Sequence, residues 1–593
     1  MHELATHDLG ALLHRVFGHR EFRAHQREVC EAATAGRDVL LVMPTGAGKS
    51  LCYQLPALAR GGVALVISPL IALMDDQAGK LEALGLRVGR VHSGMSRDDS
   101  RQACRDYLAG ELDFLFIAPE RMRVPGFPEM LAKRKPALVA IDEAHCISQW
   151  GHDFRPDYRT LGQFLPALRP APIIALTATA TPTVQRDIAK QLELQEPAIF
   201  ITGFRRTNLA VEVVELSKPQ RADFALKLLK EDGARPAIVY AASRKQAEEL
   251  ADVFKKHFPA AAYHAGLEGA TRERVQKAFL GGKLDVVVAT IAFGMGVDKA
   301  DVRTVIHVAL PGSVEAYYQE IGRAGRDGER SRTVLLHGFA DRRLQEFFLE
   351  KNYPPTTDVQ KVASALQEEF EDVESLRKRL RMDQETLDRA IEKLLGQGVA
   401  LMDVNGDVRG TGETEWKTGY EAQVAAKRAQ IDRMIAYAET TTCRMAALVH
   451  HFGDTSDKLV SCGMCDVCAP GGGNAQAAHQ PTSEERGWLK SILGALAGRS
   501  TSTGKLFTEL ALMKDRNDFD ALLDGLARAG FVSLANDTFR TEDGRDITYK
   551  KASLTSDGND VDERGLDTVW IRGAVAASGK SGSKAAAKKK SAG

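Results

Sequence analysis

The chain has 593 residues, of which 44% are hydrophobic and 27% charged, and its 79 Lys and Arg residues are balanced by 79 Asp and Glu residues. Since a domain usually holds roughly 100–200 residues, we expect roughly three to five folding units, and the zero net charge confines any nucleic-acid site to a local patch. We expect neither a signal peptide nor a membrane span, because residues 1–8 are neither basic nor apolar and no apolar run approaches roughly 18 residues.

Short β-branched runs alternate with helical segments between residues 37 and 338, a pattern typical of parallel sheets with crossover helices. Runs that are apolar throughout predict strands buried on both faces. One set lies at residues 39–43, 63–68, 113–118, 138–141 and 173–177, and a second at residues 237–240, 286–290, 305–308 and 334–336. Residues 204–209 separate the two sets. The sequence therefore predicts an α/β fold with two tandem parallel-sheet lobes, residues 1–205 and 206–340.

Beyond residue 341 we expect smaller helical modules. Residues 354–413 predict three helices, near 359–370, 375–381 and 384–395, and a hairpin that turns at Asn405-Gly406. This order is typical of a winged helix, and residues 484–547 repeat it loosely, with a wing turn at 535–537. The predicted units are a helical connector with an inserted winged-helix-like module, a cysteine-rich subdomain, a linker, a winged-helix-like C-terminal module and a disordered basic tail, at residues 341–413, 414–470, 471–483, 484–550 and 551–593.

The second predicted helix of the inserted module is basic, with Arg377, Lys378, Arg379 and Arg381 within five positions. The third helix balances its charges, so sequence-specific readout is not expected. We predict weak, sequence-independent duplex binding. The alternative is a spacer packed against the second lobe.

Residues 43–50 (Met-Pro-Thr-Gly-Ala-Gly-Lys-Ser) follow a predicted strand and open a predicted helix. Glycines let successive backbone N–H groups wrap phosphates at a helix N-terminus, while Lys49 neutralises phosphate charge and Ser50 ligates Mg²⁺. A chance glycine-rich turn would lack the Gly-Lys-Ser ending in this context. The predicted nucleotide-binding residues of this loop are Thr45, Gly46, Gly48, Lys49 and Ser50.

An acidic motif, Asp142-Glu143-Ala144-His145, ends a later buried strand. Asp142 is placed to hold Mg²⁺ through water, and Glu143 to orient or deprotonate the attacking water. Two acids at a strand end are often only a helix cap, but the phosphate loop upstream favours catalysis. His145 is predicted to couple the nucleotide to the next motif.

The phosphate loop and the acidic motif resemble those of superfamily 2 helicases, and residues 68–74, 118–121 and 177–180 are similar to the motifs between them. Residues 319–328 resemble the last motif of that superfamily. The resemblance implies that Gln319, Arg323 and Arg326 are catalytic, with the arginines reaching across the cleft to stabilise charge on the transferring phosphoryl group. The alternative is a solvated face.

Two further segments resemble the RecQ family. Residues 17–26 are similar to its N-terminal nucleotide motif, which implies that Gln26 reads the adenine edge and that Arg23 binds the nucleotide. His19 stands where the family usually has a stacking aromatic residue.

Residues 146–156 resemble the RecQ aromatic-rich loop, and the name is kept here for this range. Aromatic side chains beside an arginine offer a stacking surface for unpaired bases. The alternative is that Trp150 and Phe154 belong to the core. The residues that the resemblance assigns to DNA binding and coupling are His145, Gln149, Trp150, Phe154 and Arg155.

Four of the eight cysteines cluster late in the chain, with 18, 2 and 2 residues between them: Cys443, Cys462, Cys465 and Cys468. Their number and spacing fit a tetrahedral thiolate zinc site without an open position, which predicts a structural metal. The segment also resembles the RecQ zinc subdomain, and an iron–sulfur cluster is the rival. The other cysteines are scattered, which predicts a reducing compartment: the cytoplasm, in association with the nucleoid if the source is bacterial.

The RecQ resemblance implies RecA-like lobes that use ATP and Mg²⁺, followed by zinc-binding and winged-helix-like modules. It further implies a DNA helicase that moves on single-stranded DNA and unwinds duplexes 3′ to 5′, in DNA repair and recombination. Expected partners are single-stranded and forked duplex DNA and single-strand-binding or other repair proteins, and we expect a monomer. The rivals are an RNA helicase, disfavoured by the aromatic-rich loop and the cysteines, and a DNA-bridging adaptor with a dead ATPase, disfavoured by the complete motifs.

Overall fold

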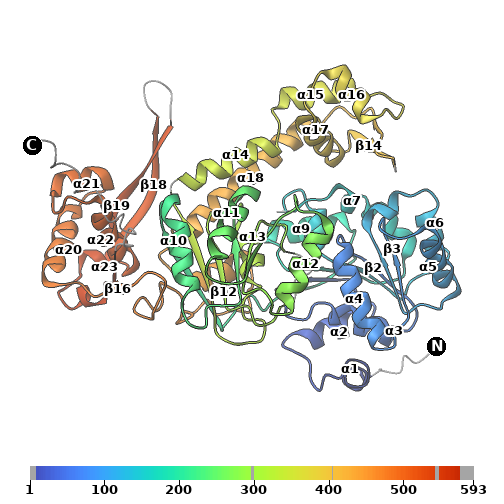
Figure 1. The fold of residues 1–593 in the computed structure, drawn as a ribbon, viewed down its shortest axis with the longest axis horizontal. Coiled ribbons are helices and arrows are strands. Elements are labelled where there is room, and N and C mark those ends of the chain that lie inside the picture. The colour runs from blue at the N-terminus through green and yellow to red at the C-terminus, as the bar shows by residue number, and fades with distance from the viewer. Residues whose placement is uncertain are drawn as a thin grey trace, which may run out of the picture.

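The computed structural model describes residues 8–151, 153–294, 299–338, 340–403, 405–540 and 546–573. The molecule is elongated, and the first lobe, the second lobe and the C-terminal module follow one another along its length (Figure 1). Among the described residues, no helix combines the length and the apolar character that crossing a membrane requires.

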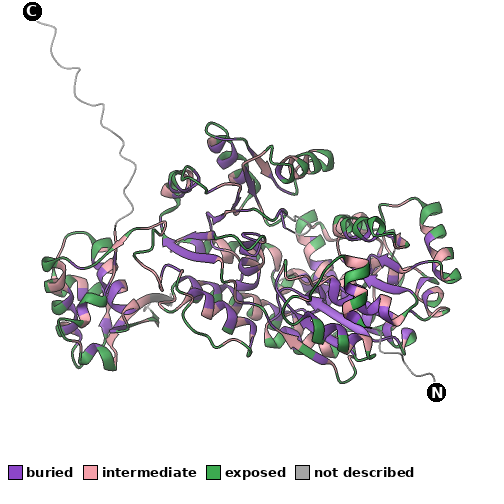
Figure 2. Ribbon diagram, turned by 90° about the horizontal axis from the view of Figure 1, so that it is seen from below, coloured by how far each residue is buried: buried purple, intermediate pink, exposed green. Residues whose placement is uncertain are grey.

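The first lobe contains a seven-stranded parallel sheet with the order β3-β4-β2-β5-β6-β1-β7. Its inner strands are buried on both faces because crossover helices cover the sheet, as Figure 2 shows. The strands are β1 (Val39–Val42), β2 (Ala64–Ile67), β3 (Val88–Val91), β4 (Phe114–Ile117), β5 (Leu138–Ile141), β6 (Ile173–Thr177) and β7 (Ala198–Ile201). The helices are α1 (Leu9–Phe17), α2 (Gln26–Thr34), α3 (Leu51–Arg60), α4 (Ile71–Ala83), α5 (Arg97–Ala109), α6 (Phe127–Ala132), α7 (Pro156–Arg159), α8 (Leu161–Phe164) and α9 (Pro182–Gln191), with short 3₁₀ turns η1 (Pro119–Arg123), η2 (Ala144–Ile147) and η3 (Leu165–Leu168).

The second lobe contains a six-stranded parallel sheet with the order β10-β11-β9-β12-β13-β8. The strands are β8 (Leu209–Glu215), β9 (Ala237–Tyr240), β10 (Ala260–Tyr263), β11 (Val286–Ala289), β12 (Thr304–His307) and β13 (Ser331–His337). The helices are α10 (Lys218–Leu229), α11 (Arg244–Phe254), α12 (Gly269–Leu280) and α13 (Val314–Ile321). Two parallel-sheet lobes are thus confirmed, and the predicted joint at residues 204–209 lies after β7 and ends on the first residue of β8.

The strands that the apolar runs predict are the inner strands of the two sheets, and the four edge strands are not among them. β3 and β7 border the first sheet, and β8 and β10 border the second. An inner strand is covered on both faces and so needs an unbroken apolar run, whereas an edge strand needs less. β3 contains a glycine and an arginine, and β10 is mostly alanine, so neither carries that signal.

A helical arm follows the second lobe. α14 (Ala340–Asn352) packs along α18 (Lys417–Ala438), and residues 354–413 form a small module at the far end of this pair, beside α7 of the first lobe (Figure 1). The module contains α15 (Thr356–Ala365), α16 (Val373–Leu380), α17 (Gln384–Gly396) and the antiparallel pair β14 (Ala400–Met402) and β15 (Val408–Gly410). The predicted Asn405-Gly406 turn is confirmed, and Gly406 has a φ of 92°.

The C-terminal part departs from the prediction in three places. β18 (Val532–Arg540) runs straight through the predicted wing turn at 535–537, because every residue from Val532 to Arg540 pairs with β19 (Asp546–Leu554) and this ladder requires extended backbone. The predicted linker contains β16 (Ala478–His479), which pairs with β20 (Ile571–Arg572). The predicted disordered tail is therefore ordered through residue 573, and residues 574–593 lie outside the described residues. The other elements are α19 (Arg444–Phe452), α20 (Ser483–Leu496), β17 (Thr501–Ser502), α21 (Thr503–Leu510), α22 (Arg516–Arg528), α23 (Ser556–Asn559) and η4 (Gly565–Thr568).

Candidate active site and metal centre

The phosphate loop lies where β1 ends and α3 begins. Gly46 and Gly48 have φ angles of 83° and 88°, the left-handed region that favours glycine. Lys49 Nζ donates to the carbonyl oxygens of Met43 at 3.0 Å and Pro44 at 3.2 Å, so its amine points into the loop. Backbone N–H groups and an ammonium gathered at a helix N-terminus suit a polyphosphate. The predicted residues at the two ends of the loop are half-buried: Thr45 and Ser50.

The acid pair follows β5, inside the same cleft. Burial and the neighbouring Glu143 raise the pKa of Asp142 to about 7, and Lys49 acts in the opposite direction. Burial lowers the pKa of Lys49, which both carboxylates oppose. Glu143 has a φ of 48°, a strained conformation that costs on the order of 1–3 kcal/mol and is often found at functional sites. Two buried carboxylates beside an ammonium fit a bound divalent cation.

His145 connects the acid pair to the end of β6. Its Nδ1 lies 2.9 Å from Thr177 Oγ1 and 3.3 Å from Glu143 Oε2, and the ring is fully buried. Tyr158 Oη donates to the Asp142 carbonyl oxygen at 2.9 Å. These contacts link the acid pair to the following motif at residues 177–180.

The N-terminal nucleotide motif is fastened to the phosphate loop. Arg23 Nη1 donates to the Gly46 carbonyl oxygen at 2.9 Å, and Gln26 Nε2 donates to those of Ala47 and Gly48 at 3.3 and 3.1 Å. A Cβ on Gly48 would lie 2.4 Å from Gln26 Nε2, so the Gln26 side chain would have to shift if Gly48 were replaced. The structure thus brings Arg23 and Gln26 to the nucleotide loop.

The two predicted arginines lie in different places beyond the end of α13. A Cβ on Gly46 would lie 3.5 Å from Arg326 Cγ, so Arg326 crosses from the second lobe to the phosphate loop, where it contributes to the lowered pKa of Lys49. Arg323 is buried within the second lobe, and its Nη2 lies 3.2 Å from a Cβ built on Gly294. Gln319 is half-buried on α13 itself. Only Arg326 of these three is placed against the loop by a contact among the described residues.

The aromatic-rich loop leaves the acidic motif and is tied to the first lobe at both ends. Ser148 Oγ donates to Asp187 Oδ2 at 2.6 Å, and Arg155 Nη1 donates to the Pro69 carbonyl oxygen at 3.0 Å. Trp150 is half-buried against the main hydrophobic core. The remaining predicted loop residues, Gln149 and Phe154, both face Gly396 of the arm module.

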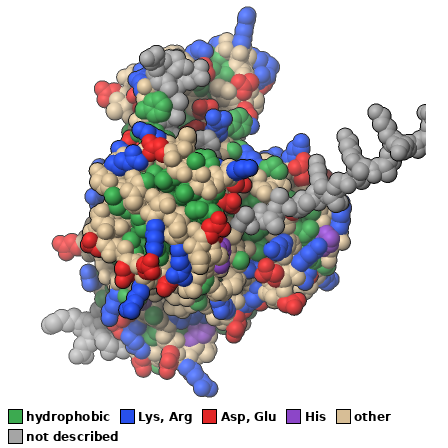
Figure 3. All heavy atoms as spheres, turned by 90° about the vertical axis from the view of Figure 1, so that its left-hand side faces the viewer, with side chains coloured by type: hydrophobic (Ala, Val, Ile, Leu, Met, Phe, Trp, Pro, Cys, Tyr) green, Lys and Arg blue, Asp and Glu red, His purple; other side chains and the backbone are tan. Residues whose placement is uncertain are grey.

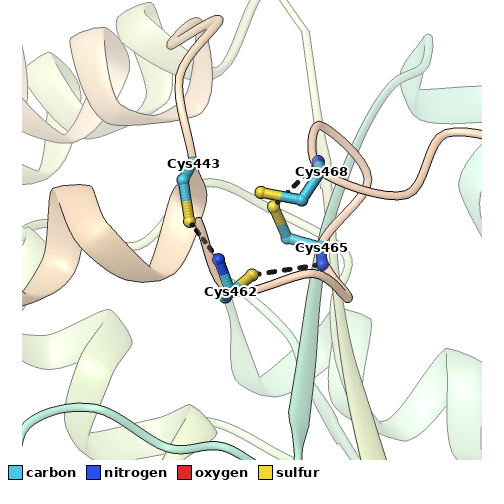
Figure 4. A group of neighbouring side chains, drawn as sticks. All are labelled: Cys443, Cys462, Cys465 and Cys468. Carbon is cyan, nitrogen blue, oxygen red and sulfur yellow. Dashed lines mark hydrogen bonds between the residues drawn. The ribbon is translucent and has the colours of Figure 1, made fainter. Parts of the chain in front are cut away.

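The four clustered cysteines converge, as Figure 4 shows, and Cys443 among them is the N-cap residue of α19. Their sulfur atoms lie within 4.8 Å of one another. Backbone N–H groups of Cys462, Cys465 and Cys468 donate to the preceding sulfur in the cluster at 3.3 to 3.4 Å, a contact that favours thiolates. Tetrahedral zinc with bonds of about 2.3 Å would place the sulfur atoms about 3.8 Å apart, which lies inside this limit, so the cluster can hold a metal ion.

Comparison with known proteins places these features in one family. The DEAD/DEAH box helicase family matches residues 23–187, the helicase conserved C-terminal domain residues 220–328, and the RecQ zinc-binding family residues 339–469. A probable ATP-dependent DNA helicase RecS from Bacillus subtilis is 36% identical over 76% of this chain and 91% of its own. The chain belongs to the RecQ family. The RecQ zinc-binding match includes residues 354–413.

Other RecQ relatives are matched over a smaller part. ATP-dependent DNA helicase RecQ from Pasteurella multocida is 44% identical over 62% of this chain and 58% of its own. The Haemophilus influenzae protein of the same name is 45% identical over 59% of this chain and 56% of its own. The match thus spans under two thirds of these relatives. The structure of the Mycobacterium smegmatis helicase Lhr bound to ssDNA and AMP-PNP has a TM-score of 0.49 at 20% identity, over 91% of this chain and 77% of that one.

Sequence patterns alone did not find two residues beside the acid pair of this RecQ-family chain, Gln77 and Tyr53. Gln77 of α4 lies beside the Asp142 carboxyl group and acts to lower its pKa. It also contacts the buried Tyr53 hydroxyl group. Neither residue lies in a phosphate or acidic motif, and only the packing of α3 against α4 brings them together. Buried polar residues on otherwise apolar helix faces would have been the available signal.

Proposed function

We propose that this RecQ-family chain is an ATP-hydrolysing helicase that translocates on single-stranded DNA and unwinds duplexes 3′ to 5′, in DNA repair and recombination. The observation that carries the proposal is the placement of Arg326, from the second lobe, against Gly46 of the phosphate loop. An engine that couples hydrolysis to lobe movement needs this cross-cleft contact, because ATP can then hold the lobes together and its loss can release them. Relatives named ATP-dependent DNA helicases support the same activity.

The proposed chemistry assigns each group a separate task. Lys49 and the N–H groups of the loop bind the phosphates, and Glu143 orients or deprotonates the attacking water. Arg326 stabilises charge on the transferring phosphoryl group, with Gln319 and Arg323 supporting it. Ser50 and Asp142 would hold Mg²⁺, which neutralises phosphate charge when bound.

The proposed DNA site is the aromatic-rich loop. Trp150, Phe154 and Arg155 would stack on unpaired bases, and His145 and Gln149 would relay occupancy to the acid pair. Figure 3, which looks onto the C-terminal end, shows basic and acidic side chains interleaved, so a uniform field over this face does not draw DNA to it. The proposed partners are single-stranded and forked duplex DNA.

The proposed metal is one structural Zn²⁺ at Cys443, Cys462, Cys465 and Cys468, where it would join the N-terminus of α19 to residues 462–468. The proposed setting is the cytoplasm, at the nucleoid in a bacterium, where single-strand-binding or other repair proteins are available partners. A monomer is the proposed state.

The nucleic acid that stimulates ATP hydrolysis tests the proposal. The steady-state ATPase rate of the full chain is measured alone, with single-stranded DNA, and with RNA of matching sequence. We expect DNA to raise the rate more strongly than RNA does. Stronger stimulation by RNA would indicate an RNA helicase, and no hydrolysis under any condition would indicate a DNA-bridging adaptor.

A further inference from the structure

Helix α18 reaches from the second lobe to the aromatic-rich loop of the first. Gln430 Nε2 donates to the Trp150 carbonyl oxygen at 2.8 Å, and Lys427 Nζ donates to the Gly151 carbonyl oxygen. Both acceptors are backbone atoms, so these contacts fix the path of the loop at Trp150 and Gly151.

The arm module adds a second hold on the loop. Gln149 Nε2 donates to the Gly396 carbonyl oxygen at 2.5 Å. A Cβ on Gly396 would lie 2.9 Å from Phe154 Cε1, so the ring packs directly on the glycine backbone. The loop is therefore held from the arm at Gln149, Trp150, Gly151 and Phe154.

The other half of the same α18 face packs on α13. Lys427, Gln430, Met434 and Tyr437 follow one another at spacings of three, four and three residues, which puts them in one stripe of the helix. Met434 and Tyr437 are buried in the core that includes α13, and the Tyr437 ring centroid lies 5.5 Å from that of Tyr317. At 1.5 Å per residue, the two ends of this stripe are only about 15 Å apart.

α13 leads directly to the arginine motif. It ends at Ile321, one residue before Gly322-Arg323, and Arg326 follows against the phosphate loop. Glu315, in the first turn of α13, also acts electrostatically on Lys427. One rigid helix thus contacts both the loop proposed to sense DNA and α13, the helix that precedes the arginine motif.

The contacts at the loop are enclosed. Gln430 is 5% exposed, and burial lowers the pKa of Lys427 to about 8 while Glu315 acts in the opposite direction. Burying a polar group without a hydrogen bond costs free energy, so the Lys427 and Gln430 side chains depend on their carbonyl partners in the loop.

We propose that Lys427 and Gln430 are positioning residues that transmit DNA occupancy of the aromatic-rich loop through α18 to α13 and the arginine motif that follows it. This proposal rests on the proposed function and assigns part of its DNA-to-ATPase coupling to a helix outside the helicase motifs. Neither side chain touches the nucleotide loop, so neither is required for hydrolysis itself.

The test uses the full chain with Lys427→Met and Gln430→Leu combined, which keeps side-chain volume and removes the donors. Arg428→Ala, an exposed change on the same helix, is the matched control, and Lys427→Arg is the conservative variant. Measurements are the basal ATPase rate, the rate with saturating oligo-dT, the oligo-dT concentration at half stimulation, and the melting temperature.

We expect the double variant to lose about fivefold to tenfold of the stimulation by DNA, with the basal rate, half-stimulating concentration and melting temperature near wild type. Lys427→Arg should retain most of the stimulation, and Arg428→Ala all of it. Unchanged stimulation would overturn the proposal, as would an equal fall in the basal and stimulated rates. A wild-type ATPase that DNA does not stimulate would instead overturn the proposed function, on which this inference rests.

Discussion

The nucleotide cleft and the four-cysteine site differ in how well their charged and polar groups are satisfied by the protein itself. The cleft encloses groups that oppose one another: a lysine with a lowered pKa, an aspartate with a raised one, and a glutamate in left-handed backbone. At the cysteine site, backbone N–H groups meet the sulfur atoms, and the buried Asp466 is paired with Arg444 at 2.8 Å. The cleft is thus poised for ligands that bind and leave, whereas the cysteine site suits an ion that stays.

Removing the Lys49 ammonium from the cleft should give the largest effect, and it should affect turnover without affecting stability. Lys49→Ala should abolish ATP hydrolysis while leaving the melting temperature and DNA binding near wild type, because Lys49 has its role in binding phosphate. Steady-state ATPase and fluorescence anisotropy with labelled oligo-dT measure both. The surface change Lys133→Ala is the control. Retention of more than roughly a few per cent of the turnover would contradict the assignment.

Replacing the strained acid should separate ATP binding from hydrolysis. Glu143→Gln keeps the size and hydrogen-bonding capacity of the side chain but accepts no proton, so we expect turnover to fall about 10²–10⁴-fold with ATP binding retained. Binding of a fluorescent ATP analogue, measured beside the hydrolysis rate, tests this. If binding is lost as well, Glu143 has a structural role.

The cysteine site should respond through stability instead of turnover alone. Elemental analysis should find one zinc per chain, and Cys465→Ser should lose it and lower the melting temperature or the yield of soluble protein, because such sites gain folding free energy from the metal. Cys104→Ser, a half-buried cysteine outside the cluster, is the control and should keep the zinc. Iron in place of zinc, or a brown protein, would point to a cluster.

Changes in the aromatic-rich loop should reduce the stimulation of ATPase by DNA, an effect smaller than the loss of hydrolysis expected in the cleft. Trp150→Ala or Phe154→Ala should reduce the stimulation of ATPase by DNA about 5- to 100-fold and the basal rate less, because stacking contributes about 1–3 kcal/mol per base. Phe347→Ala, an exposed aromatic on α14, is the control. An equal fall in both rates would assign the two residues to the core.

The smallest effect is expected at the basic helix α16. Arg379 is already bound to Glu371 and to the Ala365 carbonyl oxygen, so replacing Lys378, Arg379 and Arg381 with Ala should weaken binding to a DNA fork only about two- to threefold. The salt dependence of binding should become shallower in proportion. Fork affinity and salt slope equal to wild type would make the module a spacer.

The parts of the molecule that could be predicted from sequence are those whose signal is local. Apolar runs predict the inner strands, and the eight consecutive residues 43–50 are enough to predict the phosphate loop. Contacts between distant segments carry no such signal. Arg326 lies against Gly46 and Arg323 does not, and this difference depends on how the two lobes pack. The hydrogen bond from Gln430 to Trp150 joins residues 280 positions apart.

Strand displacement tests the proposed activity most directly. Partial duplexes with a 3′ or a 5′ single-stranded overhang are incubated with the full chain, Mg²⁺ and ATP, beside the Lys49→Ala variant. We predict ATP-dependent release of the labelled strand from the duplex with the 3′ overhang, and none with the variant. Equal release from both overhangs, or release without ATP, would contradict a 3′ to 5′ motor driven by hydrolysis in this cleft.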